Sequence, residues 1–279
     1  MADRLVAQER LQREVELAAE IQRHLLPVED NDASPICGLV RPIQEVSGDF
    51  YDHFELPDGT IAFAIGDVSG KGLNASLLMS QTASLFRCLG KTVRDPARLM
   101  SILNREICAT VSRGMFVTMV SGLYDPATGH LRFANAGHIP PLLRRPNQRS
   151  VEMPADSPPL GILAGSKYET EEVNLDGAQF VLCTDGVTEF RFGDEELGTQ
   201  GLDLLLDTAR ARSRRAISAA NFRPAKAPFC QTTFTDRRPM SRTSSVTTSR
   251  GGGFSLSIRR ICAPPRDMFV TMQGMSVRV

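Results

Sequence analysis

The sequence contains no tryptophan and only three tyrosines among its 279 residues. Proteins that bind single-stranded nucleic acid commonly stack bases on aromatic side chains, so this shortage argues against a base-stacking surface. We therefore expect nucleic acid not to be a partner. The 42% share of hydrophobic residues is ordinary for a globular protein and is enough for one large domain or two small ones.

The chain also lacks paired cysteines and long apolar runs. Its six cysteines, at positions 37, 88, 108, 183, 230 and 262, form no Cys-x-x-Cys pair and show no metal-ligand spacing. No secretory signal pattern is present, and no apolar stretch is long enough to span a bilayer. We therefore expect reduced thiols, a cytoplasmic protein and no membrane partner.

The chain as a whole is neutral, but its first 210 residues have fewer basic than acidic residues and the rest has almost no acidic ones. Residues 1–210 hold 19 lysines and arginines against 30 aspartates and glutamates, whereas residues 211–279 hold 13 against 2. The acidic body is poorly suited to nonspecific binding of nucleic acid. The basic tail could bind nucleic acid or an anionic surface, but it is rich in Arg, Ser, Thr and Pro. We expect the tail to be mostly disordered.

Helix and strand patterns divide the remaining chain. Residues 73–89 and 96–111 predict helices, and residues 50–65 and 116–135 predict two hairpins closed by Pro-Asp-Gly and Asp-Pro-Ala-Thr-Gly turns. Residues 3–26 lack Gly and Pro, and their apolar residues recur every three or four positions, at Leu11, Val15, Ala18, Ile21 and Leu25. This spacing predicts an amphipathic helix that stops at Pro27.

Two apolar runs of strand length end in an aspartate beside glycine. One is residues 61–68, which contain Gly66 and Asp67, and the other is residues 180–186, which contain Asp185. Short apolar runs bounded by glycine are typical of buried strands. Together with Asp49, which follows another glycine, these residues indicate an oxygen-ligand site for hard divalent cations.

These segments resemble a known family when they are taken together and in order. From about residue 20 to residue 206, the chain is similar to the SpoIIE/RsbU-type branch of the PPM (protein phosphatase 2C-like) metal-dependent serine/threonine phosphatases. The matching motifs are IQRHLLP at 21–27, GDFYD at 48–52, GDVSGKG at 66–72, FVT at 116–118, NAGH at 135–138, PLG at 159–161 and TDGVTE at 184–189. Each motif is weak alone, but the ordered set is specific.

The resemblance implies an α+β fold, a four-layer α-β-β-α sandwich of two antiparallel sheets flanked by helices. It also implies three parts: a linker or signalling helix at 1–27, a phosphatase domain at 28–210 and a basic tail at 211–279. The first part could serve as a dimerisation helix that makes a homodimer. The alternative is a helix that only packs on its own domain.

The site residues are also implied by the resemblance. Asp67 would bridge two Mn²⁺ or Mg²⁺ ions, the Val68 carbonyl and Asp49 would add ligands, and Asp185 would hold one ion from the other strand. Asp67 and Asp185 would be the catalytic residues. Each aspartate could instead be a turn cap. Asp52 is the doubtful member of the set, because strand alternation puts it on the opposite face from Asp49.

Of two further positions, Ser69 departs from the pattern of related phosphatases and His138 follows it. Ser69 stands where the wider superfamily carries a histidine that is taken as a general acid. His138, in the NAGH motif, is more often structural than catalytic. Protonation of the leaving group would then have to come from a metal-bound water or from another group.

The C-terminal end of the chain departs from the family more strongly. The family ends with a strand that carries Asp-Asp, then Ile or Val, then Thr, and this chain has no Asp-Asp pair. A shifted reading frame from about residue 211 would explain the change of charge and composition, and the alternative is a natural basic extension. If the tail is out of frame, we expect the terminal strand to be missing, and we expect loss of the Asp-Asp motif to impair activity.

The expected function is hydrolysis of phosphoserine or phosphothreonine on a signalling protein by a water activated by two metal ions. The resemblance implies that the substrate is a phosphorylated STAS-domain anti-sigma-factor antagonist. The alternative is a catalytically impaired, phosphatase-like module that binds and regulates the same partner.

Overall fold

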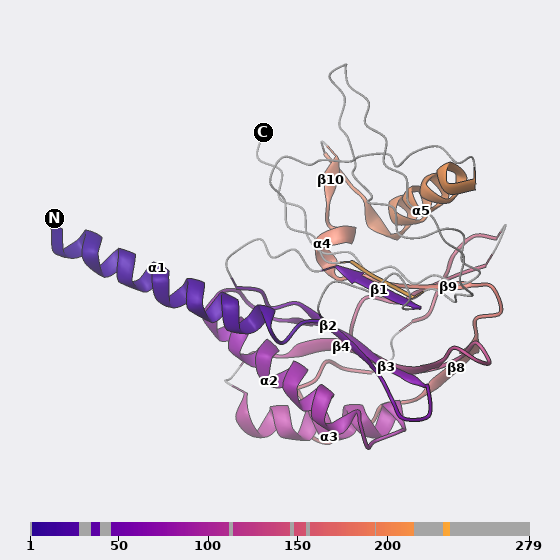
Figure 1. The fold of residues 1–279 in the computed structure, drawn as a ribbon, viewed down its shortest axis with the longest axis horizontal. Coiled ribbons are helices and arrows are strands. Elements are labelled where there is room, and N and C mark those ends of the chain that lie inside the picture. Colours follow the sequence, from indigo (N-terminus) through magenta and orange to yellow (C-terminus); the bar gives the residue numbers. More distant parts are fainter. Residues whose placement is uncertain are drawn as a thin grey trace, which may run out of the picture. The chain divides into compact units, whose positions relative to one another are not determined.

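The computed structural model of the chain describes residues 2–27, 35–39, 46–111, 114–145, 148–154, 157–192, 194–214 and 231–234. The chain divides into two compact units, the first made of 1–29, 42–140 and 153–175, and the second of 30–41, 141–152 and 176–279. Each unit carries one five-stranded antiparallel sheet (Figure 1). Two antiparallel sheets accompanied by helices confirm the expected α+β class. No helix within these described ranges is both long and apolar enough to cross a membrane.

The first unit consists of a sheet, two helices on one face of that sheet and an N-terminal helix. Its elements are α1 (Ala2–Arg23), β2 (Phe50–Glu55), β3 (Ile61–Val68), α2 (Leu73–Leu89), α3 (Pro96–Thr110), β4 (Val117–Asp125), β5 (His130–Ala136) and β8 (Glu171–Asn174). The strand order is β2-β3-β4-β5-β8. Both predicted helices and both predicted hairpins are therefore confirmed. Asp95 caps α3 by accepting a hydrogen bond from the Arg98 N–H (2.7 Å).

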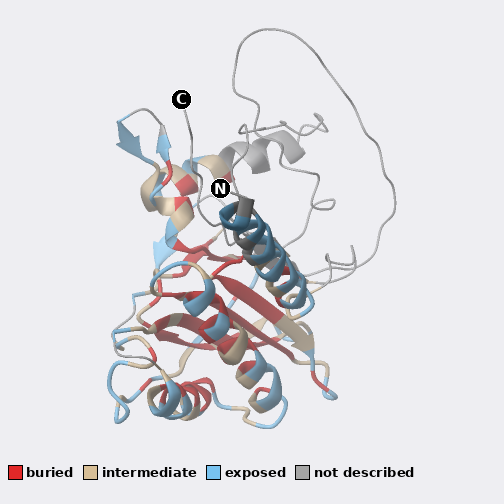
Figure 2. Cartoon of the chain, turned by 90° about the vertical axis from the view of Figure 1, so that its left-hand side faces the viewer, coloured by how far each residue is buried: buried red, intermediate tan, exposed pale blue. Residues whose placement is uncertain are grey.

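Alternation along the strands decides which residues face the helices. On β3, the side chains of Ala62, Ala64 and Val68 join one core with Met79 and Phe86 of α2. The opposite face carries the odd-numbered residues of β3, and the sheet is buried along most of its length (Figure 2). Asp67 is therefore on the face turned away from α2 and α3.

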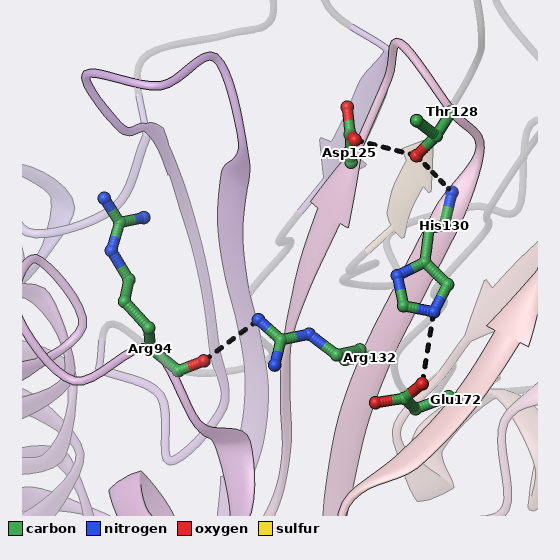
Figure 3. A network of polar contacts seen from close by, with 6 residues as sticks. All are labelled: Arg94, Asp125, Thr128, His130, Arg132 and Glu172. Carbon is green, nitrogen blue, oxygen red and sulfur yellow. Dashed lines mark hydrogen bonds and ion pairs between the residues drawn. The ribbon is translucent and has the colours of Figure 1, made fainter.

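Polar contacts hold the end of this sheet where β4 turns into β5. Thr128 donates its hydroxyl to the Asp125 carboxylate (2.7 Å) and accepts from the His130 N–H (3.3 Å) (Figure 3). The His130 ring lies 3.3 Å from Glu172 on β8, and Arg132 donates to a backbone carbonyl in the loop before α3. This network is at the far end of β4 from Thr118, the residue that pairs with Asp67, so its role is to hold the hairpin.

Helix α1 meets the rest of the first unit through one side of its C-terminal half. Ala19 and Gln22 are buried, whereas Val6, Leu17 and Ile21 are 59–65% exposed. Ile21, a member of the predicted apolar stripe, is thus on the exposed part of the helix. At 100° per residue, it lies about a quarter turn away from Gln22, which faces the sheet.

The second unit is built around a smaller sheet. Its elements are β1 (Ile36–Leu39), β6 (Leu142–Arg144), β7 (Val151–Glu152), β9 (Gln179–Leu182), α4 (Asp185–Thr188), β10 (Arg191–Phe192), β11 (Glu195–Glu196), α5 (Gly198–Arg214) and β12 (Gln231–Phe234), and the sheet order is β1-β12-β9-β6-β7. Phe180, Val181 and Leu182 are buried, which confirms the strand predicted before Asp185. The buried Arg144 on β6 lies 3.6 Å from Asp203 on α5.

Strand β12 corrects the expectation that the tail leaves a strand missing from this sheet. It pairs antiparallel with β1 over four residues and with β9 at Thr232 and Thr233. Thr and Phe favour the extended, pleated backbone, which explains why this short run of a basic tail can fill the position. The prediction of disorder for the remaining tail falls outside the described residues.

Candidate metal centre

Oxygen-bearing side chains form a row across the ends of three neighbouring strands of the first unit. The β2–β3 pairing ends at Phe50 and Gly66, and Asp49 and Asp67 are the next residues along the chain at that end. By alternation, both are on the face opposite Phe50. The β3–β4 register pairs Asp67 with Thr118. Residues directly opposite each other in antiparallel strands share a face, with Cβ atoms about 4.5–5.5 Å apart. Asp49, Asp67 and Thr118 therefore share the face turned away from α2 and α3.

Two glycines make this row possible by letting other groups approach closely. A Cβ on Gly66 would lie 2.6 Å from the Phe50 ring and 3.0 Å from the Thr118 carbonyl oxygen. A Cβ on Gly48 would lie 3.0 Å from the Val68 carbonyl oxygen. The chain before Asp49 therefore runs directly beside the Val68 carbonyl, which the family resemblance implies as a backbone ligand.

Ser69 holds the loop that follows Asp67. Its backbone N–H donates to the Phe116 carbonyl (2.9 Å), and its Oγ accepts from the Phe116 N–H (2.8 Å). Gly70 and Gly72 have φ angles of 95° and 76°, a region that side chains rarely adopt, and α2 begins immediately afterwards. Ser69 is at the position where the resemblance implies a histidine in the wider superfamily. In this structure its side chain hydrogen-bonds the Phe116 backbone instead.

His138 lies close to the same row, a placement that the sequence did not predict. The Asn135 side chain closes a turn at the end of β5, accepting from the His138 N–H (2.8 Å) and donating to the His138 carbonyl (3.1 Å). Gly137 allows the turn at φ 65°, tight against Pro159. The buried imidazole places Nδ1 2.8 Å from the Thr118 Oγ1, and that hydroxyl is 3.4 Å from the Asp67 carbonyl oxygen.

Asp52 is on the other face of β2, as strand alternation predicted. Its two carboxylate oxygens accept from Nε and an Nη of Arg87 on α2, the Nε bond being 2.8 Å. Burial raises the pKa of Asp52 to about 6, although the Arg87 guanidinium opposes the rise. The Arg87 side chain is 44% exposed and remains hydrated, which limits its compensation. The Asp52–Arg87 ion pair therefore connects α2 to β2 of the sheet.

Asp185 belongs to the second unit and begins the short helix α4. Its side chain is exposed, and the preceding Cys183 and Thr184 are buried. Burial raises the pKa of the Cys183 thiol to about 12, so this cysteine is protonated at neutral pH and is part of the packing. The pairing of Asp185 with Asp67 at one metal pair stays a prediction.

The donors that the first unit brings together suit a hard cation. They are two carboxylates and a backbone carbonyl, with no thiol or imidazole in the row, and Mg²⁺ and Mn²⁺ favour such oxygen ligands. Within the described residues, no group of three or more His, Cys, Asp or Glu side chains is placed to hold a metal ion. The described site is thus an incomplete ligand set with the right chemistry, and a further carboxylate would have to come from elsewhere in the chain.

Comparison with solved structures defines the class of the fold. The chain is similar to the SiaA-PP2C domain of Pseudomonas aeruginosa, with a TM-score of 0.63 and 22% identity over 72% of this chain and 82% of that one. It is also similar to the RsbU and RsbW domains of Rv1364c from Mycobacterium tuberculosis, with a TM-score of 0.55 and 25% identity over 65% of this chain and 51% of that one. The fold is therefore of the PP2C type.

Sequence comparison places the chain within this class. The family described as Stage II sporulation protein E (SpoIIE) matches residues 57–233, more than half of the chain. The chain belongs to the SpoIIE family. The matched range includes Asp67 and Asp185, begins after Asp49 and continues past residue 210 to β12.

Curated relatives agree with this assignment. Phosphoserine phosphatase RsbU of Bacillus subtilis is 32% identical over 204 residues, which are 72% of this chain and 61% of the relative. Protein IcfG of Synechocystis is 28% identical over 71% of this chain and 36% of the relative. Phosphoserine phosphatase RsbP of Bacillus subtilis is 26% identical over 63% and 45%. The chain thus spans between about a third and three fifths of the length of these relatives.

Proposed function

We propose that the chain hydrolyses phosphoserine or phosphothreonine on a signalling protein, with a water activated by two divalent metal ions. One observation carries the proposal: Asp49 and Asp67 end neighbouring strands in one register row, beside the Val68 carbonyl. Membership of the SpoIIE family and the names of the RsbU and RsbP relatives support the same reaction.

The proposed roles follow from the placement of each group. Asp67 would bridge the two ions, and Asp49 and the Val68 carbonyl would add ligands. Asp185 would contribute a further carboxylate. Mn²⁺ and Mg²⁺ are the proposed ions because every donor is an oxygen. Such a pair, when bound, supplies an acidified water and offsets the charge of the phosphoryl group.

The proposed substrate is a phosphorylated STAS-domain anti-sigma-factor antagonist, and the cytoplasm is the proposed location. The relatives named phosphoserine phosphatase RsbU and RsbP support a phosphoserine protein as substrate.

We also propose that α1 forms a homodimer contact. Val6, Leu17 and Ile21 are exposed on one side of the helix, opposite the buried Ala19. Deletion of residues 1–20 should lower the sedimentation coefficient from that of a dimer to that of a monomer while leaving metal affinity within about twofold, because the deleted residues are remote from Asp67. An unchanged sedimentation coefficient would assign α1 to its own domain alone.

The alternative function is a phosphatase-like module that binds the same partner without turnover. The incomplete ligand set of the described residues and the missing Asp-Asp pair favour it. Calorimetric titration of the full chain with Mn²⁺, together with phosphate release from a phosphoserine peptide, separates the two functions. Two bound ions and metal-dependent release support the enzyme, whereas peptide binding without release supports the module.

A further inference from the structure

A hydrogen-bond chain connects the buried imidazole of His138 to the backbone of Asp67. His138 Nδ1 lies 2.8 Å from Thr118 Oγ1, and the Thr118 hydroxyl lies 3.4 Å from the Asp67 carbonyl oxygen. A hydroxyl has a single hydrogen. If that hydrogen is donated to the Asp67 carbonyl, Thr118 Oγ1 accepts from the imidazole, which assigns the ring proton to Nδ1.

The two ends of this chain are held by independent contacts. At one end, the Asn135 side chain bonds both the N–H and the carbonyl of His138, and Gly137 packs against Pro159. At the other end, Asp67 pairs with Thr118 of β4, and the preceding Gly66 also pairs with Phe50 of β2. Thr118 therefore connects a rigid turn with the last residues of β3, from which the Asp67 side chain emerges.

We propose that Thr118 and His138 are positioning residues that orient Asp67 for metal binding. The inference rests on the proposed function, because it assumes that Asp67 is a metal ligand. Removal of a group that orients a metal ligand by hydrogen bonding typically lowers metal affinity or activity by about 10–100-fold. Such support is needed here because Asp67 lies one residue from the end of its strand, where the ladder gives least restraint.

The decisive experiment measures Mn²⁺ affinity in the full chain by calorimetry and by the electron paramagnetic resonance signal of free Mn²⁺. Thr118→Val keeps the shape of the side chain but removes the hydroxyl, and it should weaken Mn²⁺ binding by about tenfold or more. Thr118→Ser retains the hydroxyl and should restore most of the affinity. The KM for a phosphoserine peptide should change less than the Mn²⁺ concentration that gives half-maximal turnover.

Ser121 offers a matched control on the same strand. Its buried hydroxyl donates to the Phe63 carbonyl (3.1 Å), the same kind of β4-to-β3 contact but three residues further from the metal end than Thr118. Ser121→Ala should lower thermal stability without changing Mn²⁺ affinity. If Ser121→Ala weakens Mn²⁺ binding as much as Thr118→Val does, the effect is general loosening of the sheet and the proposal is wrong.

His138 provides a second pair of variants in case Thr118→Val does not fold. His138→Leu removes the donor and should weaken Mn²⁺ binding, while His138→Asn can still donate to Thr118 and should weaken it less. Unchanged Mn²⁺ affinity in folded Thr118→Val, or in folded His138→Leu, overturns the positioning role and leaves the proposed function standing. Failure of the wild-type chain to bind Mn²⁺ would overturn the proposed function and this inference together.

Discussion

Asp67 is the residue on which the proposed reaction depends most directly, because it lies between Asp49 and Thr118 in the row. Asp67→Asn keeps the side-chain shape and removes the charge that would bridge two cations, so metal-dependent phosphate release should fall to background. Thermal unfolding should change by only a few degrees. Asp58→Asn is the control, since Asp58 caps the β2–β3 turn at the opposite end and an amide can still accept from the Thr60 N–H. Ordinary metal-dependent turnover in Asp67→Asn would refute the bridging role.

Asp52 gives a prediction about stability and pH. Its pKa is raised from 3.8 to about 6 in the folded chain, so the folded state binds more protons than the unfolded state between these values. The stabilisation is complete below pH 3.8 and is lost as the pH rises through about 6, by about 1–3 kcal/mol in total.

Urea unfolding of the wild type and of Asp52→Asn at pH 4.5 and pH 7 measures this effect. The wild type should lose stability relative to Asp52→Asn as the pH rises, because asparagine does not titrate and the other groups cancel in the difference. A stability difference that stays constant would show that Arg87 cancels the effect of burial, and one that grows in favour of the wild type at pH 7 would show that Arg87 outweighs it.

At the scale of secondary structure elements, α1 is joined to the metal end through one buried side chain. Gln22 donates to the Ser47 carbonyl (2.8 Å) and accepts from the Ser47 N–H (2.9 Å), and the Ser47 hydroxyl accepts from the Asp49 N–H (3.0 Å). The position of Asp49 is thus set partly by α1. Residues 40–45, which precede this segment, are outside the described part of the chain.

Gln22→Ala should destabilise the chain by about 1–3 kcal/mol, because it leaves both backbone groups of Ser47 without their side-chain partner. Arg10→Ala is the control on the same helix, since the Arg10–Glu14 pair is exposed and should contribute little. Chemical unfolding of both variants measures the difference. Equal effects would mean that Gln22 does not anchor α1.

The elements were predictable from sequence where the signal is local. The glycine and aspartate at the end of β3, the Asp95 cap and the hairpin turns all depend on neighbouring residues, and the structure confirms them. The Thr118–His138 contact depends on the register between β4 and β5 and on the turn that the Asn135 side chain closes after β5. No periodicity in one sequence encodes that register, so the contact could be found only in the structure.

Other features also depend on tertiary packing. The helical repeat predicts that α1 is amphipathic but not which side is covered, and Ile21 is exposed while Ala19 and Gln22 are buried. The tail was expected to add no strand because its overall composition is typical of disorder. Composition averages over the whole tail, whereas only four residues are needed to fill a position between β1 and β9.

At the scale of the whole molecule, the origin of the tail is a separate prediction. A shifted frame from about residue 211 remains our hypothesis, and an uninterrupted frame on resequencing the locus would reject it. The family match reaches residue 233 and β12 lies at Gln231–Phe234, so both extend beyond residue 210.

Replacement of the tail is a second test. If the frame is shifted, replacement of the tail beyond β12 by a segment that carries Gly-Asp-Asp-Val-Thr should raise Mn²⁺-dependent phosphate release by orders of magnitude, because it adds the expected carboxylate.

Two truncations test whether the tail supports the second sheet. A chain that ends at residue 235 retains β12, whereas a chain that ends at residue 230 loses it and exposes the facing edges of β1 and β9. The shorter chain should unfold several degrees lower, should aggregate more readily, and should exchange the amide hydrogens of Val181 and Leu182 faster. The longer chain should match the full-length protein in all three measurements. Identical unfolding and exchange in the two truncated chains would show that β12 contributes nothing to the sheet and that the whole tail behaves as its composition predicts.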